Sequence, residues 1–193
     1  MTITVEQIRK FLGGHQRREL EKSNLKKAAV LMLFYPKGED LFVLLTKRTE
    51  DVEHHKGQVS FPGGSQDEGD VNLVATALRE SEEEIGLPQD AVQVFGMFDE
   101  YETPSGFAIT PVVAYAHCLP PLKHNVIEVA EILEVPVSLF LDKRNERVEK
   151  RVRLGTLLDV YFYRFGDYEI WGATAAILRA FLQSLRAPHA GAS

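Results

Sequence analysis

The sequence predicts a domain of the α/β or α+β class, in which helices pack against a mixed β-sheet. Short apolar runs of strand length outnumber the helical patterns along the chain. A long helical pattern nevertheless occupies the middle of the chain, and an amphipathic helix closes it. This mixture is typical of a layered domain, although it leaves the order of the strands open.

The size and composition fit one globular domain over residues 1–193. The chain is 45% hydrophobic and 26% charged, with a formal net charge of -6. Nucleic-acid-binding proteins more often carry a basic balance, so we expect no nucleic-acid partner. No run reaches the ~20 apolar residues that span a membrane, and the N-terminus lacks a signal-peptide pattern. We therefore expect a cytoplasmic protein without a membrane partner. The single cysteine, Cys118, lies in an apolar stretch that predicts a buried thiol.

The first part of the chain is predicted from two kinds of signal. Apolar residues at helical spacing indicate a helix near the N-terminus, ended by Gly13 and Gly14. Two apolar runs joined by a Pro/Gly turn indicate two neighbouring strands. The expected elements are a helix over 5–12, a charged and mobile linker over 15–26, strands over 28–35 and 41–46, a loop over 47–57 and a turn over 61–64. Residues 1–26 thus form a helix and linker ahead of the main fold.

The remainder continues with one long helix followed by strands. Residues 147–154 alternate charged and apolar side chains, as a half-exposed strand does. The expected elements are a helix over 71–85, strands over 92–98, 110–117 and 131–136, a short helix or turn over 137–141, strands over 147–154 and 157–165, and a helix over 174–185. The tail over 187–193 is expected to be flexible.

The central helix carries a cluster of glutamates on one face. At 100° per residue, Glu80, Glu83 and Glu84 fall within about 100° of one another. The apolar stripe of the same helix lies on another side and consists of Val74, Leu78, Ser81 and Ile85. Gly86 suits the left-handed position that ends a helix, so the glutamates lie in its last turns.

This position is unfavourable for glutamates unless something compensates their charge. The C-terminal end of a helix prefers positive charge, and like charges four residues apart destabilise it. Two explanations stay open at this level: solvent screens the carboxylates, or a divalent cation such as Mg²⁺ binds among them. Arg79, within reach of Glu83 and Glu82, could orient a metal-binding carboxylate or form a surface ion pair.

Residues 64–87 resemble the Nudix box. The box is a glycine, a spacer, and then Arg-Glu-apolar-any-Glu-Glu-any-Gly-apolar; residues 79–87 match it with Ser81 in place of the apolar residue. The spacer after Gly64 is one residue longer than the general pattern, and Asp67 and Asp70 replace its early glutamate.

The upstream residues are similar to the coenzyme A pyrophosphatase branch of that family. Its signature reads Leu-Leu-Thr-any-Arg, and later Gly, three residues, Phe-Pro-Gly-Gly. Residues 44–48 (LLTKR) and 57–64 (GQVSFPGG) match both parts. Glu53 stands where the signature usually has a second arginine.

The resemblance implies a Nudix fold, a mixed sheet between helices with a loop–helix–loop catalytic motif. It implies hydrolysis of coenzyme A or acyl-coenzyme A at the diphosphate, to 4′-phosphopantetheine and adenosine 3′,5′-bisphosphate, with Mg²⁺ or Mn²⁺ as cofactor. The implied catalytic residues are Arg79, Glu80, Glu83 and Glu84. The implied metal ligands are Glu80, Glu83, Glu84 and the Gly64 carbonyl. The implied substrate-binding residues are Arg48, Lys56, Phe61, Gly63 and Gly64.

Several alternatives remain at this level. The general base is Glu80 or another box glutamate, or else Glu128 or Glu131 from a later loop. The substrate could instead be ADP-ribose, NADH or a nucleoside triphosphate, and a non-catalytic Nudix-like binding domain is the alternative from another class. Phe61 fits the core as well as a pocket, and the N-terminal helix could form a homodimer contact.

Overall fold

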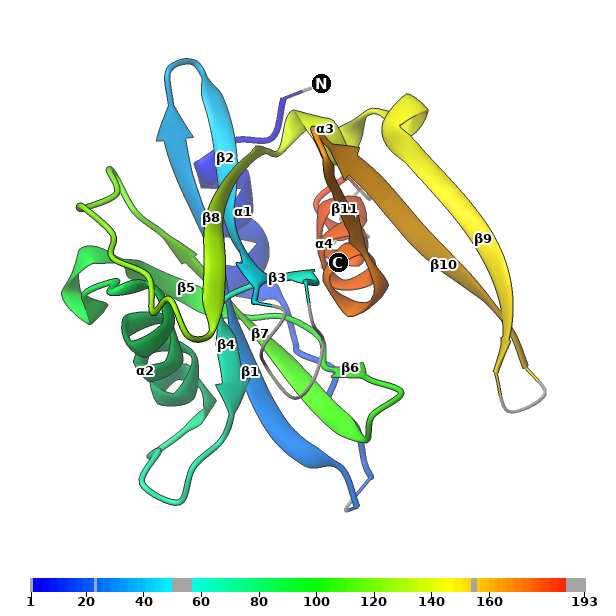
Figure 1. Ribbon diagram of the computed structural model, residues 1–193, viewed down its shortest axis with the longest axis horizontal. Helices are drawn as coiled ribbons and strands as arrows, with labels where there is room; N and C mark the ends of the chain where they lie inside the picture. The colour runs from blue at the N-terminus through cyan, green and yellow to red at the C-terminus, as the bar shows by residue number, and fades with distance from the viewer. Residues whose placement is uncertain (1, 23, 50–56, 154–155, 187–193) are drawn as a thin grey trace.

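The computed structural model describes residues 2–22, 24–49, 57–153 and 156–186 (Figure 1). The helices are α1 (Val5–Gly14), α2 (Leu73–Ile85), α3 (Ser138–Leu141) and α4 (Gly172–Ser184), with 3-10 turns η1 (Gln89–Ala91) and η2 (Lys143–Asn145). The strands are β1 (Lys26–Lys37), β2 (Asp40–Arg48), β3 (Val59–Ser60), β4 (Gly63–Ser65), β5 (Gln93–Met97), β6 (Tyr101–Glu102), β7 (Phe107–Tyr115), β8 (Val129–Pro136), β9 (Glu146–Arg153), β10 (Thr156–Phe165) and β11 (Tyr168–Trp171). Not one of the helices in these ranges is long and apolar enough to cross a membrane.

The larger sheet is mixed, as the sequence predicts. Its main path runs β3-β2-β1-β7-β5, while β8 pairs with β2, β4 with β1 and β6 with β7. Strand β1 pairs in parallel with β7 and antiparallel with β2 and β4. The expected α/β or α+β class is therefore confirmed.

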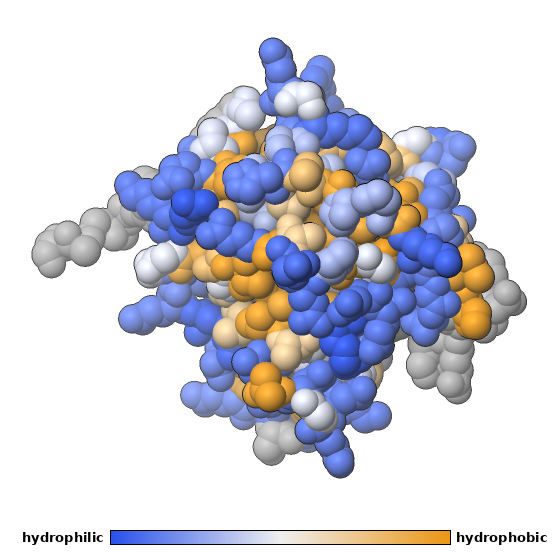
Figure 2. All heavy atoms as spheres, turned by 90° about the vertical axis from the view of Figure 1, so that its left-hand side faces the viewer, coloured by the Kyte–Doolittle hydropathy of each residue, from blue (hydrophilic) through white to orange (hydrophobic). Residues whose placement is uncertain are grey.

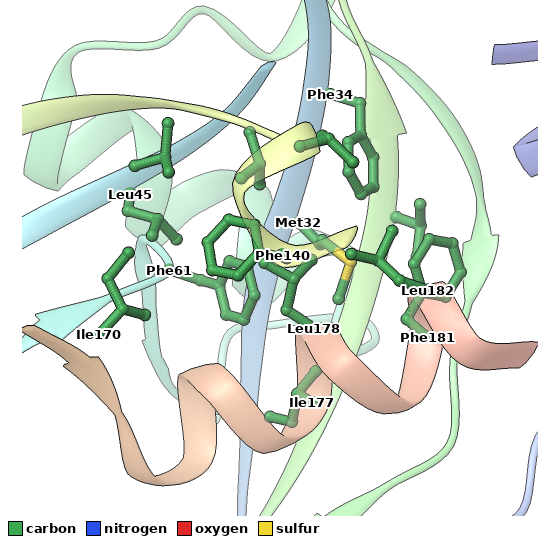
Figure 3. Close-up of a cluster of buried hydrophobic side chains, with 14 of the residues drawn as sticks. Met32, Phe34, Leu45, Phe61, Phe140, Ile170, Ile177, Leu178, Phe181 and Leu182 are labelled. Atoms are coloured by element: carbon green, nitrogen blue, oxygen red, sulfur yellow. The ribbon is translucent and has the colours of Figure 1, made fainter. Parts of the chain in front are cut away.

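Strand β1 is buried on both faces, which explains its continuous apolar run. Leu31 and Leu33 belong to the core beneath α2, whereas Met32 and Phe34 belong to the core on the opposite face. Figure 3 shows Met32 and Phe34 near Phe181 and Leu182 of α4. The larger sheet thus lies between α2 on one face and α1 with α4 on the other (Figure 1).

A second sheet of three strands, in the order β11-β10-β9, stands beside α4. Its base is anchored by Tyr163, which is fully buried and packs against Phe140 with ring centroids 5.0 Å apart. The hydroxyl of Tyr163 donates to Glu146 at 2.6 Å, and Arg179 of α4 donates to the same carboxylate at 2.7 Å. Beyond this base, β9 and β10 project from the body as a hairpin, which we call the arm (Figure 1).

The segment expected to be a mobile linker is instead bonded to the loop between β5 and β6. His15 donates to the carboxylate of Asp99 at 2.8 Å, and the backbone N–H of Arg18 donates to the same carboxylate at 3.0 Å. The backbone N–H of Leu20 donates to Glu100 at 2.7 Å. The ring of His15 and two backbone N–H groups of this segment therefore bond to carboxylates far away in the sequence, which a local pattern does not reveal.

Two other sequence-based expectations are corrected. Cys118 is exposed rather than buried, because β7 ends at Tyr115 and the chain has already left the sheet. Gly63 and Gly64 were expected in a turn, but they lie in β4, where Gly63 pairs with Val30 of β1. Three-residue strands such as β4 are too short to show a periodic pattern.

Candidate active site

Helix α2 carries Glu80, Glu83 and Glu84 in its last turns, as the sequence predicts. The side chain of Asn72 accepts a hydrogen bond from the backbone of Ala75 at 2.9 Å and begins the helix. Gly86, at φ 65°, ends it in the left-handed conformation. Ser81 is fully buried, and its hydroxyl donates to the carbonyl of Ala77 at 2.7 Å. A serine is therefore accommodated on the core side of the helix.

Glu84 is the most buried of the three glutamates, with 3% of its surface exposed. The backbone N–H of Gly63 donates to its carboxylate at 3.1 Å, and Nη1 of Arg48 makes a long contact at 3.4 Å. Burial raises the pKa of Glu84 to about 7, although both contacts oppose that shift. A carboxylate so incompletely compensated is one that a cation would stabilise.

The glycine pair in β4 allows two close approaches. A Cβ atom on Gly63, which has φ 145°, would lie 2.4 Å from the carbonyl oxygen of Ala29. A Cβ atom on Gly64 would lie 2.4 Å from an oxygen of the Glu80 carboxylate. Gly63 therefore permits the pairing of β4 with β1, and Gly64 permits Glu80 to lie directly against the backbone of β4. Burial also raises the pKa of Glu80, against the opposing effect of Arg79.

Arg79 connects the glutamates to the loop before the helix. Its Nε and Nη2 atoms each donate to Asp70 at 2.9 Å, in a bidentate pair. Its Nη1 atom donates to Glu80 at 3.0 Å and to Glu83 at 3.2 Å. The hydrogen bonds from Arg79 to Asp70, followed by one from the backbone N–H of Asp67, hold the pKa of the Asp70 carboxyl well below its usual range. Arg79 thus fixes the orientation of two box glutamates, and Asp70 fixes Arg79.

The sequence did not reveal Asp70 as the principal partner of Arg79. The expected neighbour Glu82 instead accepts a hydrogen bond from Gln89 at 2.8 Å. One indication of this role is present in the sequence, because an aspartate in the spacer replaces the usual glutamate of the motif. The pattern indicated an acidic residue there without indicating its partner.

The three glutamates differ sharply in exposure. The side chain of Glu83 is 60% exposed, that of Glu80 17% and that of Glu84 4%. Within the described ranges, no three Asp, Glu, His or Cys side chains converge as a ready-made metal site. The donor set still fits Mg²⁺ or Mn²⁺, because both cations prefer oxygen ligands and the buried carboxylate of Glu84 is only partly compensated by Gly63 and Arg48.

The predicted substrate-binding residues of the upstream signature lie in different environments. Arg48 reaches Glu84, and its Nε atom is buried without a hydrogen-bond partner in the part of the chain that the structure describes. Phe61 is only 3% exposed and lies in the core near Phe140 (Figure 3), so its side chain is not available to a substrate. Lys56 lies outside the described residues.

Glu128 and Glu131, the two later candidates for the general base, have different surroundings. The charge of Glu128 contributes to the raised pKa of Glu84, and Asn125 joins the two segments by donating to the backbone carbonyl of Glu84 at 2.8 Å. Glu131 instead accepts a hydrogen bond from the hydroxyl of Tyr168 in β11. Glu128 is therefore the later-loop carboxylate associated with α2.

The surface over α2 is mostly hydrophilic. Figure 2 views the molecule from the side on which α2 lies in Figure 1, and hydrophilic side chains cover most of that face with apolar ones between them. The exposed carboxylate of Glu83 belongs to this helix.

Comparisons with known proteins agree with this architecture. The model of the NUDIX domain matches residues 25–155. An uncharacterized Nudix hydrolase NudL from Photorhabdus laumondii is 39% identical over 166 residues, covering 84% of this chain and 87% of the relative. The crystal structure of a Nudix hydrolase from M. smegmatis, RenU, aligns with a TM-score of 0.51 at 28% identity, covering 58% of this chain and 71% of that chain. A MutT/nudix family protein from Enterococcus faecalis aligns with a TM-score of 0.52 at 17% identity, covering 95% of this chain and 70% of that chain.

A mixed sheet between helices, with a loop–helix–loop motif around α2, is the architecture of a diphosphate-cleaving hydrolase. The chain belongs to the Nudix family. It is a pyrophosphatase that acts on a small-molecule derivative of a nucleoside diphosphate, and enzymes of this family generally use divalent metal ions.

Proposed function

We propose that this enzyme hydrolyses coenzyme A or an acyl-coenzyme A to 4′-phosphopantetheine, or its acyl form, and adenosine 3′,5′-bisphosphate. The supporting observation is that two separate motifs meet at one carboxylate. Arg48 from the coenzyme A signature and Gly63 from its end both contact Glu84 of the Nudix box. The segment that resembles a substrate signature therefore borders the catalytic helix directly.

The proposed cofactor is Mg²⁺ or Mn²⁺, held by Glu80, Glu83, Glu84 and the Gly64 carbonyl. Carboxylate and carbonyl oxygens are the ligands that these ions prefer. Bound there, a divalent ion would neutralise the diphosphate and lower the pKa of an attacking water. The backbone N–H of Gly63 is engaged with Glu84, so we assign Gly63 to the carboxylate rather than to the substrate.

The protein's own residues supply orientation and proton transfer in this proposal. Arg79 positions Glu80 and Glu83, as its hydrogen bonds indicate. Water attacks one phosphorus as the bridging P–O bond breaks, and a general base accepts the proton of the water. Glu80 or another box glutamate is the first choice for that base. Glu128 is the second, and we prefer it to Glu131, whose carboxylate is bonded to Tyr168.

Arg48 is the proposed contact for a substrate phosphate. A guanidinium group matches phosphate geometry, and the side chain of Arg48 is 26% exposed beside Glu84. Lys56 stays a prediction for the same role, and Phe61 is left out because it is buried. The cytoplasmic location and the absence of nucleic-acid and membrane partners also stay predictions.

A substrate panel tests the proposal. We would measure kcat/KM with Mg²⁺ and with Mn²⁺ for coenzyme A, acetyl-coenzyme A, dephospho-coenzyme A, ADP-ribose, NADH and ATP. We expect the highest values for coenzyme A or its acyl derivative. We expect Arg48→Ala to reduce the preference for coenzyme A over dephospho-coenzyme A. Faster cleavage of ADP-ribose, NADH or ATP would show that the substrate assignment is wrong.

A further inference from the structure

Two consecutive apolar residues in the turn before β8 are left open to solvent. Val126 is 75% exposed and Ile127 is 74% exposed. A single exposed apolar residue is common on a protein surface, whereas contiguous apolar surface beside polar groups is typical of a ligand-binding surface. The other large apolar residues that are exposed in the described ranges lie just before α2 and on the arm, at Val71, Val148, Val152, Leu157 and Leu158.

The turn that carries this apolar pair is bonded to the last turn of α2. The backbone N–H of Asn125 donates to the backbone carbonyl of Glu84 at 2.8 Å. The side chain of Asn125 accepts from the N–H of Ile127 at 3.1 Å, and its carbonyl accepts from the N–H of Val129 at 2.8 Å. Figure 1 shows the segment that leads into β8 passing next to α2. The backbone here is already ordered, so binding a ligand would cost little conformational entropy.

The same turn is bonded to the end of β2, where Arg48 lies. Thr49 donates its N–H to the carbonyl of Glu128 at 3.0 Å and its hydroxyl to the carbonyl of Ile127 at 2.7 Å. Arg48, the residue before Thr49, contacts the carboxylate of Glu84. The apolar pair therefore borders the candidate site, next to the two segments that supply Arg48 and Glu84.

Coenzyme A differs from the alternative substrates in the group that follows its diphosphate. On the pantetheine side, the ester oxygen is followed by a methylene group and then by a carbon atom that carries two methyl groups. ADP-ribose, NADH and ATP instead have a ribose or a further phosphate at that place. These polar groups would lose hydrogen bonds to water against an aliphatic surface. An aliphatic border beside the diphosphate site therefore favours the pantetheine side of coenzyme A.

We infer that Val126 and Ile127 contact the dimethyl-bearing segment of the pantetheine arm, and that this contact selects coenzyme A over ribose-linked diphosphates. The inference rests on the proposed function and assigns to this turn the half of the substrate that leaves as 4′-phosphopantetheine. The adenosine half, on the other side of the diphosphate, makes no contact with the turn in this arrangement.

Separate binding of the two products tests the assignment. Calorimetry in the presence of Mg²⁺ measures the Kd of 4′-phosphopantetheine and of adenosine 3′,5′-bisphosphate, and steady-state hydrolysis of coenzyme A gives KM and kcat. For Val126→Ser with Ile127→Ser, we expect about tenfold weaker binding of 4′-phosphopantetheine and about tenfold higher KM. The Kd of adenosine 3′,5′-bisphosphate and kcat should change by less than about twofold, because the lost contact is the same in the ground state and the transition state.

Two further variants serve as controls. Val152→Ser with Leu157→Ser removes a valine and a larger aliphatic residue, 73% and 57% exposed, from neighbouring positions on the arm. This matched control should leave both Kd values, KM and kcat unchanged. The exchange Val126→Ile with Ile127→Val keeps the aliphatic surface of the turn and should retain the natural affinity for 4′-phosphopantetheine.

The outcomes separate this inference from the proposed function. Equal weakening of both products, weakening of adenosine 3′,5′-bisphosphate alone, or no change in either would overturn the inference while coenzyme A is still cleaved. A natural chain that does not cleave coenzyme A would refute the proposed function, and this inference with it.

Discussion

Replacing Gly63 or Gly64 of β4 by alanine should have different consequences for stability and activity. Alanine at Gly64 would place a methyl group 2.4 Å from a carboxylate oxygen of Glu80. Alanine at Gly63 would place it 2.4 Å from the carbonyl oxygen of Ala29 and 2.6 Å from the Cα atom of Val30. The first obstacle is the end of a flexible side chain, whereas the second is backbone.

The expected magnitudes follow from what has to move. At Gly64, Glu80 can swing away by about 1 Å, so the loss of stability should stay below ~1 kcal/mol. A misplacement of about 1 Å at the chemistry can cost ~10²-fold in rate. At Gly63, strain from φ 145° adds to the backbone clash, and together these should cost ~2–6 kcal/mol.

Urea unfolding and steady-state hydrolysis of coenzyme A, measured on the same preparations, separate the two effects. Gly69→Ala is the matched control, because a Cβ atom there meets nothing within 4 Å. We expect Gly64→Ala to be as stable as Gly69→Ala but about 10²-fold slower. We expect Gly63→Ala to be strongly destabilised. Full activity in Gly64→Ala, or a stability loss equal to that of Gly63→Ala, would refute the assigned contact with Glu80.

Three further predictions concern the carboxylates. Glu84→Gln should lower kcat by at least ~10²-fold while circular dichroism stays unchanged; an active variant would remove Glu84 from the catalytic set. Because burial raises the pKa of Glu84 from 4.5 to about 7, the metal-free protein should lose up to ~3 kcal/mol of stability as the pH rises through that window. Urea unfolding between those pH values should show a flatter profile for Glu84→Gln, and identical slopes would contradict the shift. Asp70→Asn should destabilise the protein by ~1–3 kcal/mol at neutral pH, because Arg79 loses its bidentate partner. That difference should vanish as the pH falls below the range where Asp70 ionises, and its persistence in acid would argue against the ion pair.

The fold was predictable where burial is continuous over many residues. Strands β1 and β2 appear as apolar runs because both faces of each are covered. The two-residue strands β3 and β6 carry no such pattern, since only their partners in the sheet define them. The fixed path of the N-terminal segment depends on Asp99, more than eighty residues away, which no local reading can supply.

The site was predictable in its residue types and less so in its environment. Helical spacing places three glutamates on one side of α2, but it cannot tell that Glu84 is buried and Glu83 exposed. That difference arises because β4 passes over the helix and Gly63 donates to Glu84. The role of Asp70 likewise depends on how the loop before α2 folds back to Arg79.

The chain contains a single tryptophan, and its position has a practical consequence. Trp171 lies where the small sheet meets α4, with its ring stacked on Phe162 at a centroid distance of 5.9 Å and with Arg151 nearby. Its fluorescence emission is therefore a built-in optical reporter for one corner of the molecule. Solvent quenching of that signal would report how exposed this corner is, without any added dye.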